Sequence, residues 1–155
     1  MSNSSMYPHG SGDTSPEILA QPRQGVGAVM IKNRNNQILV SYSLKRRVWD
    51  IPQGKSEGSE GHLETVLREV KEEINLNLDT SRLDYRATFK SPDKGFGNKP
   101  FITNLYFYEV SPEEEAQIKN MELNKLKDLH WVNPQQIPQP YGLSLRIALV
   151  LDNIR

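Results

Sequence analysis

The sequence lacks cysteine in all of its 155 residues, which excludes disulfide bonds and thiolate metal sites. No apolar run approaches the roughly 20 residues that a membrane-spanning helix needs, and no basic start followed by an apolar block marks a secretory signal. Net charge is also missing, because 19 basic residues balance 19 acidic ones. Non-specific nucleic-acid binders usually carry a basic excess, so that class is disfavoured. We expect a cytoplasmic protein whose metal ligands are oxygen or imidazole.

The N-terminal segment is rich in serine, glycine and proline and poor in large apolar side chains. Such a segment buries too little surface to offset its chain entropy. Residues 1–22 are therefore predicted to be a flexible tail. One domain is predicted at residues 23–155, a length that fits a single hydrophobic core.

Hydrophobic periodicity predicts both strands and helices in this domain. The predicted strands cover residues 25–32, 37–43, 82–90, 101–110 and 129–132. Helices are predicted at residues 62–76, after Ser111, after Asn133 and at residues 142–153, with loops at residues 52–61 and 91–100. Because strands and helices interleave without regular alternation, we expect an α+β fold with a mixed sheet flanked by helices.

Three glutamates share one face of the predicted helix at residues 62–76. Glu69, Glu72 and Glu73 are spaced i, i+3 and i+4, which places them within an arc of about 100°. Like charges at this spacing weaken a helix, and a hard divalent cation such as Mg²⁺ would neutralise them through its preference for carboxylate oxygens. Acid-rich faces are also commonly just solvated, so the helix alone leaves both interpretations open.

A longer pattern around this helix favours the metal site. Its fixed positions are Gly54, Glu60, Arg68, Glu69, Val70, Glu72, Glu73 and Leu76. The pattern resembles the Nudix box, and the preceding WDIPQG run at residues 49–54 is similar to the family's usual approach to it. The family's late glycine is Asn75 here. That glycine ends the helix in a left-handed conformation, which asparagine tolerates, so we expect Asn75 to be left-handed.

The resemblance to the Nudix family implies an α/β/α sandwich with a mixed β-sheet. It implies an enzyme that hydrolyses the pyrophosphate linkage of a nucleoside polyphosphate or dinucleoside polyphosphate. The implied cofactor is Mg²⁺, with Mn²⁺ as a substitute. Its implied ligands are Glu69, Glu72, Glu73 and the Gly54 carbonyl oxygen.

The resemblance also implies supporting roles for residues beside the ligands. Arg68 and Glu60 form a structural pair in the family, and a planar guanidinium suits this role because it binds a carboxylate through two bonds. A carboxylate takes the proton from the attacking water, and the family recruits it from the box or from a later loop. The candidates here are Glu69 and Glu122, with residues 113–115 as weaker ones.

Candidate substrate-binding residues lie near the box and in later loops. They are Arg46, Arg47, Lys55, Lys94, Lys99, Phe96 and Tyr141. The cations could contact phosphates and the aromatic rings could stack on a base. Surface charge and core packing explain the same residues equally well.

Two alternatives to a small-molecule hydrolase stay open. The first is an enzyme acting on a capped or triphosphorylated RNA 5′ end, which is the form of nucleic acid the sequence allows. The PQG run at residues 52–54 resembles the Nudix branch that acts on dinucleoside polyphosphates and on the triphosphate end of RNA. The neutral charge, and Lys55 where a second glycine is usual in that branch, count against the RNA alternative. The second is a non-catalytic nucleotide sensor, but such domains typically lose the carboxylates that are present here. We expect a nucleotide-type substrate and no membrane partner, and a homodimer is compatible with the sequence.

Overall fold

The computed structural model describes residues 5–8, 25–90, 102–136, 142 and 148. Its strands are β1 (Ser5–Pro8), β2 (Gly25–Lys32), β3 (Ile38–Ser43), β4 (Val48–Asp50), β5 (Gln53–Lys55), β6 (Asp84–Lys90), β7 (Ile102–Glu109) and β8 (Leu126–Val132). Its helices are α2 (His62–Ile74), α3 (Pro112–Gln117) and the short 3-10 helix η1 (Pro134–Gln136). The α+β class and the mixed sheet predicted from the sequence are confirmed.

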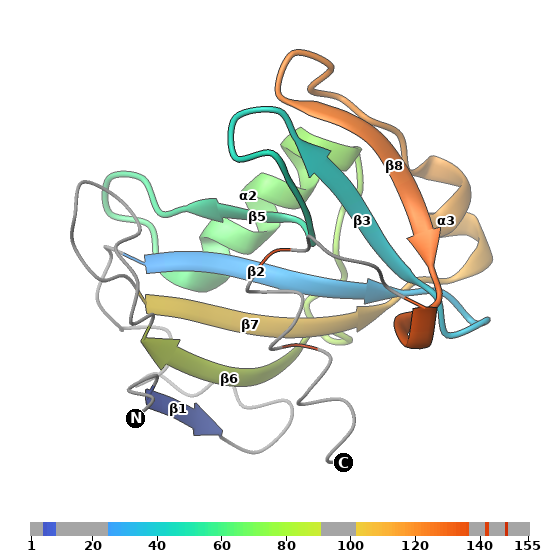
Figure 1. Cartoon of the computed structure of the whole chain (residues 1–155). Coiled ribbons are helices and arrows are strands. Elements are labelled where there is room, and N and C mark those ends of the chain that lie inside the picture. Colours follow the sequence, from blue (N-terminus) through green and yellow to red (C-terminus); the bar gives the residue numbers. More distant parts are fainter. Residues whose placement is uncertain (1–4, 9–24, 91–101, 137–141, 143–147, 149–155) are drawn as a thin grey trace.

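The described strands form one sheet in the order β1-β6-β7-β2-β3-β4, with β5 paired to β2 and β8 paired to β3. Strands β2 and β7 run parallel, while the other pairs are antiparallel. Lys32 pairs with Ile38 next to the β2–β3 turn. Beyond that pair the two strands diverge, so the sheet opens into an arm containing β2 and an arm containing β3, β4 and β8 (Figure 1).

Helix α2 packs across one face of the sheet, behind it in Figure 1. Alternation along β2 sends Val29 and Ile31 to this face, where they meet Val66 and Val70 of the helix. Met30 points to the opposite face and joins a second cluster. The buried residues of this second cluster are Ala28, Met30, Ile38, Val40, Ile51, Ala87, Leu105, Phe107 and Ala148. The sheet therefore has an apolar core on both of its faces.

Residues 52–61 were expected to form a loop, and this prediction is wrong for Gln53–Lys55. These residues form β5, with Gly54 opposite Gly27 of β2. The pairing is possible because Gly27 and Gly54 have no side chains, so β2 and β5 can approach helix α2 closely. A Cβ atom added at Gly27 would lie 2.7 Å from Val66 Cγ2, and a glycine cluster in the sequence does not distinguish such an approach from a turn.

Other predicted boundaries also change in the structure. Ser5–Pro8, within the predicted tail, form β1, which pairs with β6. Such a strand is held by backbone hydrogen bonds, which the side-chain composition of a segment does not predict. The rest of the predicted tail and the loop predicted at residues 91–100 lie outside the described residues. Of the helix predicted at residues 142–153, Gly142 and Ala148 are described and both are buried. None of the helices described is long and apolar enough to cross a membrane.

Helix α2 ends at Asn75, whose φ of 63° and ψ of 29° are left-handed, as predicted. The Asn75 amide donates to the Lys71 carbonyl at 3.1 Å. Its side-chain Nδ2 donates to the Gln117 carbonyl at 3.3 Å. Asparagine therefore supplies both the conformation of the usual glycine and an extra contact with the last residue of α3.

We expect Asn75→Ala to destabilise the protein by about 1–2 kcal/mol, because a left-handed alanine has no compensating side-chain hydrogen bond. Asn75→Gly should change the free energy of unfolding by less, since glycine adopts this conformation without strain. Urea unfolding of the two variants measures the difference. Equal stability of both variants would show that the left-handed geometry is not what Asn75 provides.

Candidate active site

The candidate site lies where strand β5 contacts helix α2. A Cβ atom added at Gly54 would lie 2.0 Å from the Glu69 Cδ atom. A side chain at position 54 would therefore require Glu69 to move, because real Cβ atoms do not approach carbon that closely. Gly54 therefore allows the Glu69 carboxylate to lie directly against the backbone of β5.

Arg68 organises the acidic side chains around it. Its Nε atom donates to Glu60 Oε2 at 2.6 Å and its NH2 group to Glu60 Oε1 at 3.0 Å, a two-bond contact. Its NH1 group donates to Glu69 at 2.9 Å and to Glu72 at 3.1 Å. The NH2 group also donates to the Lys55 carbonyl at 3.2 Å. The Arg68 guanidinium therefore connects the loop before α2, the end of β5 and the glutamates on the face of α2.

Glu73 is the buried acid of the site, with only 8% of its surface exposed. It shares a hydrogen bond with Glu69, and the Gln53 backbone amide donates to it. Burial raises the pKa of Glu73 well above its usual value, and the nearby Glu69 and Glu122 carboxylates raise it further. Burial also raises the pKa of Glu69, although Glu73 and Arg68 oppose this shift. The two carboxylates therefore form a close pair that a positive charge would stabilise.

The segment after α3 brings Glu122 toward this pair. The Met121 amide donates to the Glu73 carbonyl at 2.9 Å, and the Lys119 amide donates to the Ile74 carbonyl at 3.1 Å. These bonds satisfy carbonyls that the last turn of any helix leaves open. Asn120 Oδ1 accepts from the Glu122 amide at 2.9 Å and fixes the turn. The Glu122 side chain lies 3.6 Å from Lys125 Nζ.

Glu72 does not join the Glu69–Glu73 pair. Its side chain is 51% exposed and contacts Arg68. Within the described ranges, no three acidic, histidine or cysteine side chains converge as a ready-made ligand group. The structure thus brings together Gly54, Glu69 and Glu73 of the predicted ligand set, and a rotation of Glu72 away from Arg68 would be needed to complete it.

Predicted substrate-binding residues fall into two groups. Arg46, Arg47 and Lys55 are exposed. Arg46 binds the buried Asp50 at 3.3 Å, and Arg47 adopts a φ of 56° in the β3–β4 turn. Lys94, Phe96, Lys99 and Tyr141 lie outside the described residues.

Asp50 is a buried acid that the sequence pattern did not identify. Its Oδ1 atom accepts from the Ile51 amide at 2.8 Å, and a Cβ atom added at Gly142 would lie 2.0 Å from its Oδ2 atom. Burial raises its pKa, against the lowering effect of Arg46. The sequence did contain a signal for a buried acid, because Asp50 stands between the apolar residues Trp49 and Ile51. An acid buried in such a stretch needs hydrogen-bond or charged partners.

The Arg68–Glu60 pair predicts a specific pH dependence of stability. Hydrogen bonds from Arg68 lower the pKa of Glu60 from 4.5 to about 2, with a smaller contribution from the Glu57 amide. A lowered folded-state pKa stabilises the fold above the unfolded pKa, and the stabilisation is lost as the pH falls through the folded pKa. Compared with Glu60→Gln, the wild-type protein should therefore be more stable at pH 6, and this advantage should shrink between pH 4.5 and pH 2. Urea unfolding across this range measures the difference, and a constant difference would contradict the assigned pairing.

Comparison with known proteins identifies the family. A family model described as the NUDIX domain matches residues 21–153. The chain therefore belongs to the NUDIX family, and residues 54–76 contain its box. An RNA pyrophosphohydrolase from Ruthia magnifica subsp. Calyptogena magnifica is 37% identical over 57 residues, which cover 37% of this chain and 31% of that protein. The match thus spans about a third of the relative's length.

Solved structures share the fold. A MutT NUDIX hydrolase from Burkholderia pseudomallei superposes with a TM-score of 0.70 and 22% identity, covering 84% of this chain and 98% of that one. A mutant form of a Bacillus subtilis pyrophosphohydrolase gives a TM-score of 0.65 and 19% identity, covering 97% and 91%. A C. elegans Ap4A hydrolase gives 0.66 and 14%, covering 84% and 95%. At these identities the similarity establishes the fold and does not identify the substrate.

Proposed function

We propose that this NUDIX-family chain is a divalent-metal-dependent hydrolase that cleaves a phosphoric anhydride bond of a nucleoside polyphosphate or dinucleoside polyphosphate. The observation that carries this proposal is the Glu69–Glu73 pair, held against the Gly54 backbone and bonded to Arg68. The proposed catalytic domain is residues 23–155.

The donor chemistry of the site fits a hard cation. Two carboxylates at hydrogen-bond distance with raised pKa values repel one another once both are ionised. Mg²⁺ or Mn²⁺ prefers such oxygen ligands. Glu69 and Glu73, with Glu72 after rotation and the Gly54 carbonyl, would hold the ion. Bound there, the ion supplies charge neutralisation at the phosphate oxygens and lowers the pKa of a water ligand.

The protein's own groups have distinct tasks in this reaction. Arg68 holds Glu69 in place through its contact with Glu60, and the rigid β5 backbone fixes Gly54 beside it. Glu69 and Glu122 lie near Glu73 and are the proposed acceptors of the proton from water. The exposed Lys55, Arg46 and Arg47 supply positive charge for the substrate's phosphates.

A substrate panel tests the proposal. Nucleoside triphosphates, dinucleoside polyphosphates, ADP-ribose and capped or triphosphorylated RNA would each be incubated with the full chain and Mg²⁺ or Mn²⁺, and the products resolved by chromatography. We expect cleavage of at least one compound, and none in the presence of EDTA. Binding without cleavage across the panel would favour a nucleotide sensor.

An RNA 5′ end is the second candidate substrate. It is favoured by the partial match to an RNA pyrophosphohydrolase and by the three consecutive exposed basic residues 45–47 in the β3–β4 turn. Phosphate release from triphosphorylated RNA, at a rate above that from GTP, would select this alternative.

A further inference from the structure

Three aromatic side chains meet on the arm of the sheet formed by β3, β4 and β8. The Trp49 ring lies 5.4 Å from the Tyr42 ring and 5.1 Å from the His130 ring between centroids, both edge to face. Trp49 also packs against the apolar cluster on the sheet face opposite α2. We call Tyr42, Trp49 and His130 the aromatic cluster. It has a defined geometry because three neighbouring strands fix its members.

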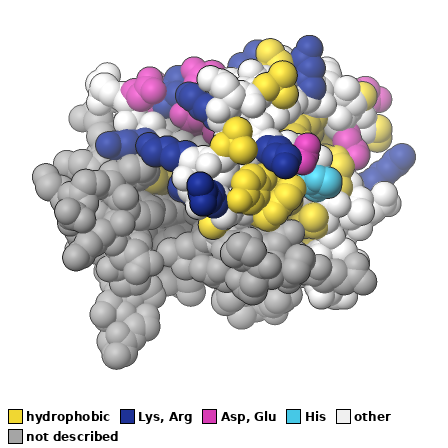
Figure 2. Space-filling view, turned by 45° about the horizontal axis from the view of Figure 1, so that its top comes forward, with side chains coloured by type: hydrophobic (Ala, Val, Ile, Leu, Met, Phe, Trp, Pro, Cys, Tyr) yellow, Lys and Arg dark blue, Asp and Glu magenta, His cyan; other side chains and the backbone are white. Residues whose placement is uncertain are grey.

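The aromatic cluster is accessible from solvent. His130 is exposed, whereas Tyr42 and Trp49 are partly exposed. Figure 2 shows hydrophobic side chains gathered on one face beside a histidine, with lysine and arginine side chains around them. A partly exposed aromatic ring in such a position can accept another planar ring by stacking.

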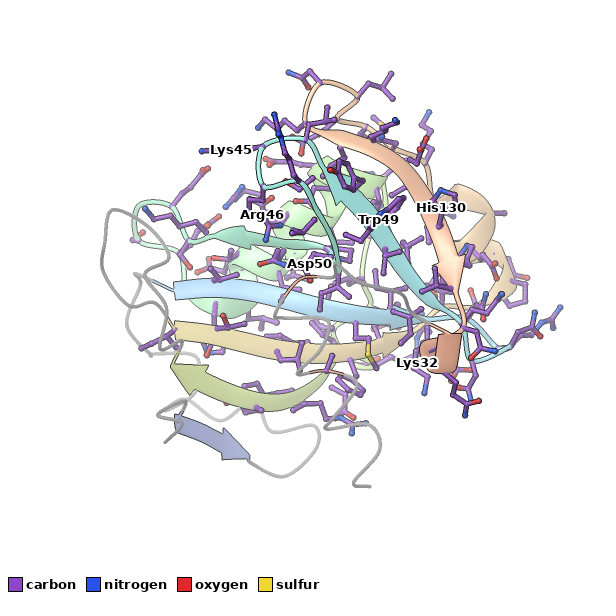
Figure 3. The ribbon with its side chains drawn as sticks, viewed as in Figure 1. Lys32, Lys45, Arg46, Trp49, Asp50 and His130 are labelled. Carbon is purple, nitrogen blue, oxygen red and sulfur yellow. The ribbon has the colours of Figure 1, made fainter. Side chains whose placement is uncertain are left out.

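Positive charge borders the aromatic cluster. Lys45 and Arg46 belong to the β3–β4 turn, and Lys127 pairs with Tyr42 across the β3–β8 ladder. In Figure 3 the labelled Arg46 and Asp50 lie to one side of Trp49, and His130 lies to the other. The Arg46 side chain is 49% exposed while it binds Asp50, so it remains accessible to an anion.

The chain connects the aromatic cluster directly to the candidate active site. Trp49 precedes Gly54 by five residues, which even when fully extended span at most about 18 Å. That length is comparable with an extended nucleoside triphosphate. Trp49 and Gly54 are therefore separated by no more than about the length of such a ligand.

We propose that the aromatic cluster is a nucleobase-binding surface of this protein. The base stacks against the cluster while the phosphates lie at Glu69 and Gly54, and the positive charge of Lys45, Arg46 and Lys127 attracts the anionic nucleotide toward this surface. Stacking on aromatic rings suits any base because each base has a π face. This inference rests on the proposed function for the position of the phosphates, but base binding can be measured without turnover.

The two tryptophans of the chain provide a direct test. Trp131→Phe leaves Trp49 as the single tryptophan of the chain. Trp49→Phe leaves Trp131, which packs on the face toward α2 and serves as the matched control. Each variant would be titrated in Mg²⁺ with β,γ-imido analogues of ATP and GTP, and with inorganic tripolyphosphate as a probe without a base.

We expect the nucleotide analogues to quench Trp49 emission and tripolyphosphate to leave it unchanged. Trp131 emission should change with neither. Equal effects of tripolyphosphate and nucleotide on Trp49, or no change at nucleotide concentrations up to saturation or the solubility limit, would overturn the proposal. A 5′-triphosphorylated dinucleotide distinguishes a free nucleotide from an RNA end as the source of the base. Quenching by the GTP analogue would show that the surface binds the base of a mononucleotide. Quenching by the dinucleotide alone would show that it binds a base within RNA.

A second measurement tests the contribution of an exposed member of the aromatic cluster. His130→Ala should weaken nucleotide binding about tenfold by calorimetry, the size expected for loss of one base–aromatic contact. Its affinity for tripolyphosphate should not change, and Arg34→Ala, at the exposed β2–β3 turn, should bind both ligands like the wild type. Equal weakening for both ligands would contradict the proposal. Quenching without any hydrolysis would support this surface and contradict the proposed enzyme, while hydrolysis without quenching would do the reverse.

Discussion

Glu73→Gln should reduce the hydrolysis rate by more than about 100-fold, because partners that only orient metal ligands already contribute 10–100-fold. The glutamine amide has nearly the same shape as the carboxylate but lacks its negative charge. Stability should not fall, since burial disfavours the charged form of Glu73 in the absence of a cation. The initial rate on the best substrate and the thermal midpoint would be measured on the same preparation.

A control on the same helix makes this result specific. Glu64 lies in the first turn of α2, is exposed and accepts from the Gly61 amide at 2.9 Å. Glu64→Gln removes the same charge from the same helix and should retain nearly full activity. Full activity of Glu73→Gln would remove this residue from the proposed metal site, and a lowered thermal midpoint would point to a structural role.

Gly54→Ala should have the second largest effect. The added methyl group would meet the Glu69 carboxylate at 2.0 Å, so either the β5 backbone or Glu69 must move. Overpacking of this kind destabilises a protein by about 1–3 kcal/mol. A displaced Glu69 would also weaken metal binding, so the concentration of Mg²⁺ that gives half-maximal activity should rise. Unfolding by urea and a Mg²⁺ titration measure the two effects separately.

Gly58→Ala is the matched control for this substitution. Gly58 has a φ of 55° and open space around its Cα atom. Alanine there is strained by the backbone alone, at about 1–2 kcal/mol, and lies away from Glu69. We expect a loss of stability without a change in Mg²⁺ dependence. If both variants show the same Mg²⁺ dependence as the wild type, Gly54 is not required for placing Glu69.

Much of the site could be predicted because it depends on short-range spacing. The i, i+3 and i+4 glutamates of α2 share a face in any α-helix, and Asn75 has one low-cost way to end that helix. The contact between Arg68 and Glu60 was implied by the resemblance of residues 54–76 to the Nudix box. The structure agrees with each of these expectations.

The rest depends on contacts between segments far apart in sequence. The burial of Glu73 requires β5 and the segment containing Met121, and a surface helix with the same sequence would leave this acid in water. Glu72 was placed in the ligand set by spacing, but the spacing does not show that Arg68 holds it outward. The Trp49–His130 contact depends on the β3–β8 register, in which Val40 lies opposite His130. No pattern of periodicity fixes such a register.

The turn at residues 117–122 is attached to the end of α2 chiefly by main-chain amides. Side chains at several of its positions thus carry little of the attachment, and Met121 is 48% exposed. The neighbouring Leu123 is 78% exposed. These two positions form a natural place for a substitution library that alters the rim of the site while the main chain keeps Glu122 near Glu73. Asn120 is the position to leave unchanged, because its side chain binds both the Glu122 amide and the Leu126 carbonyl.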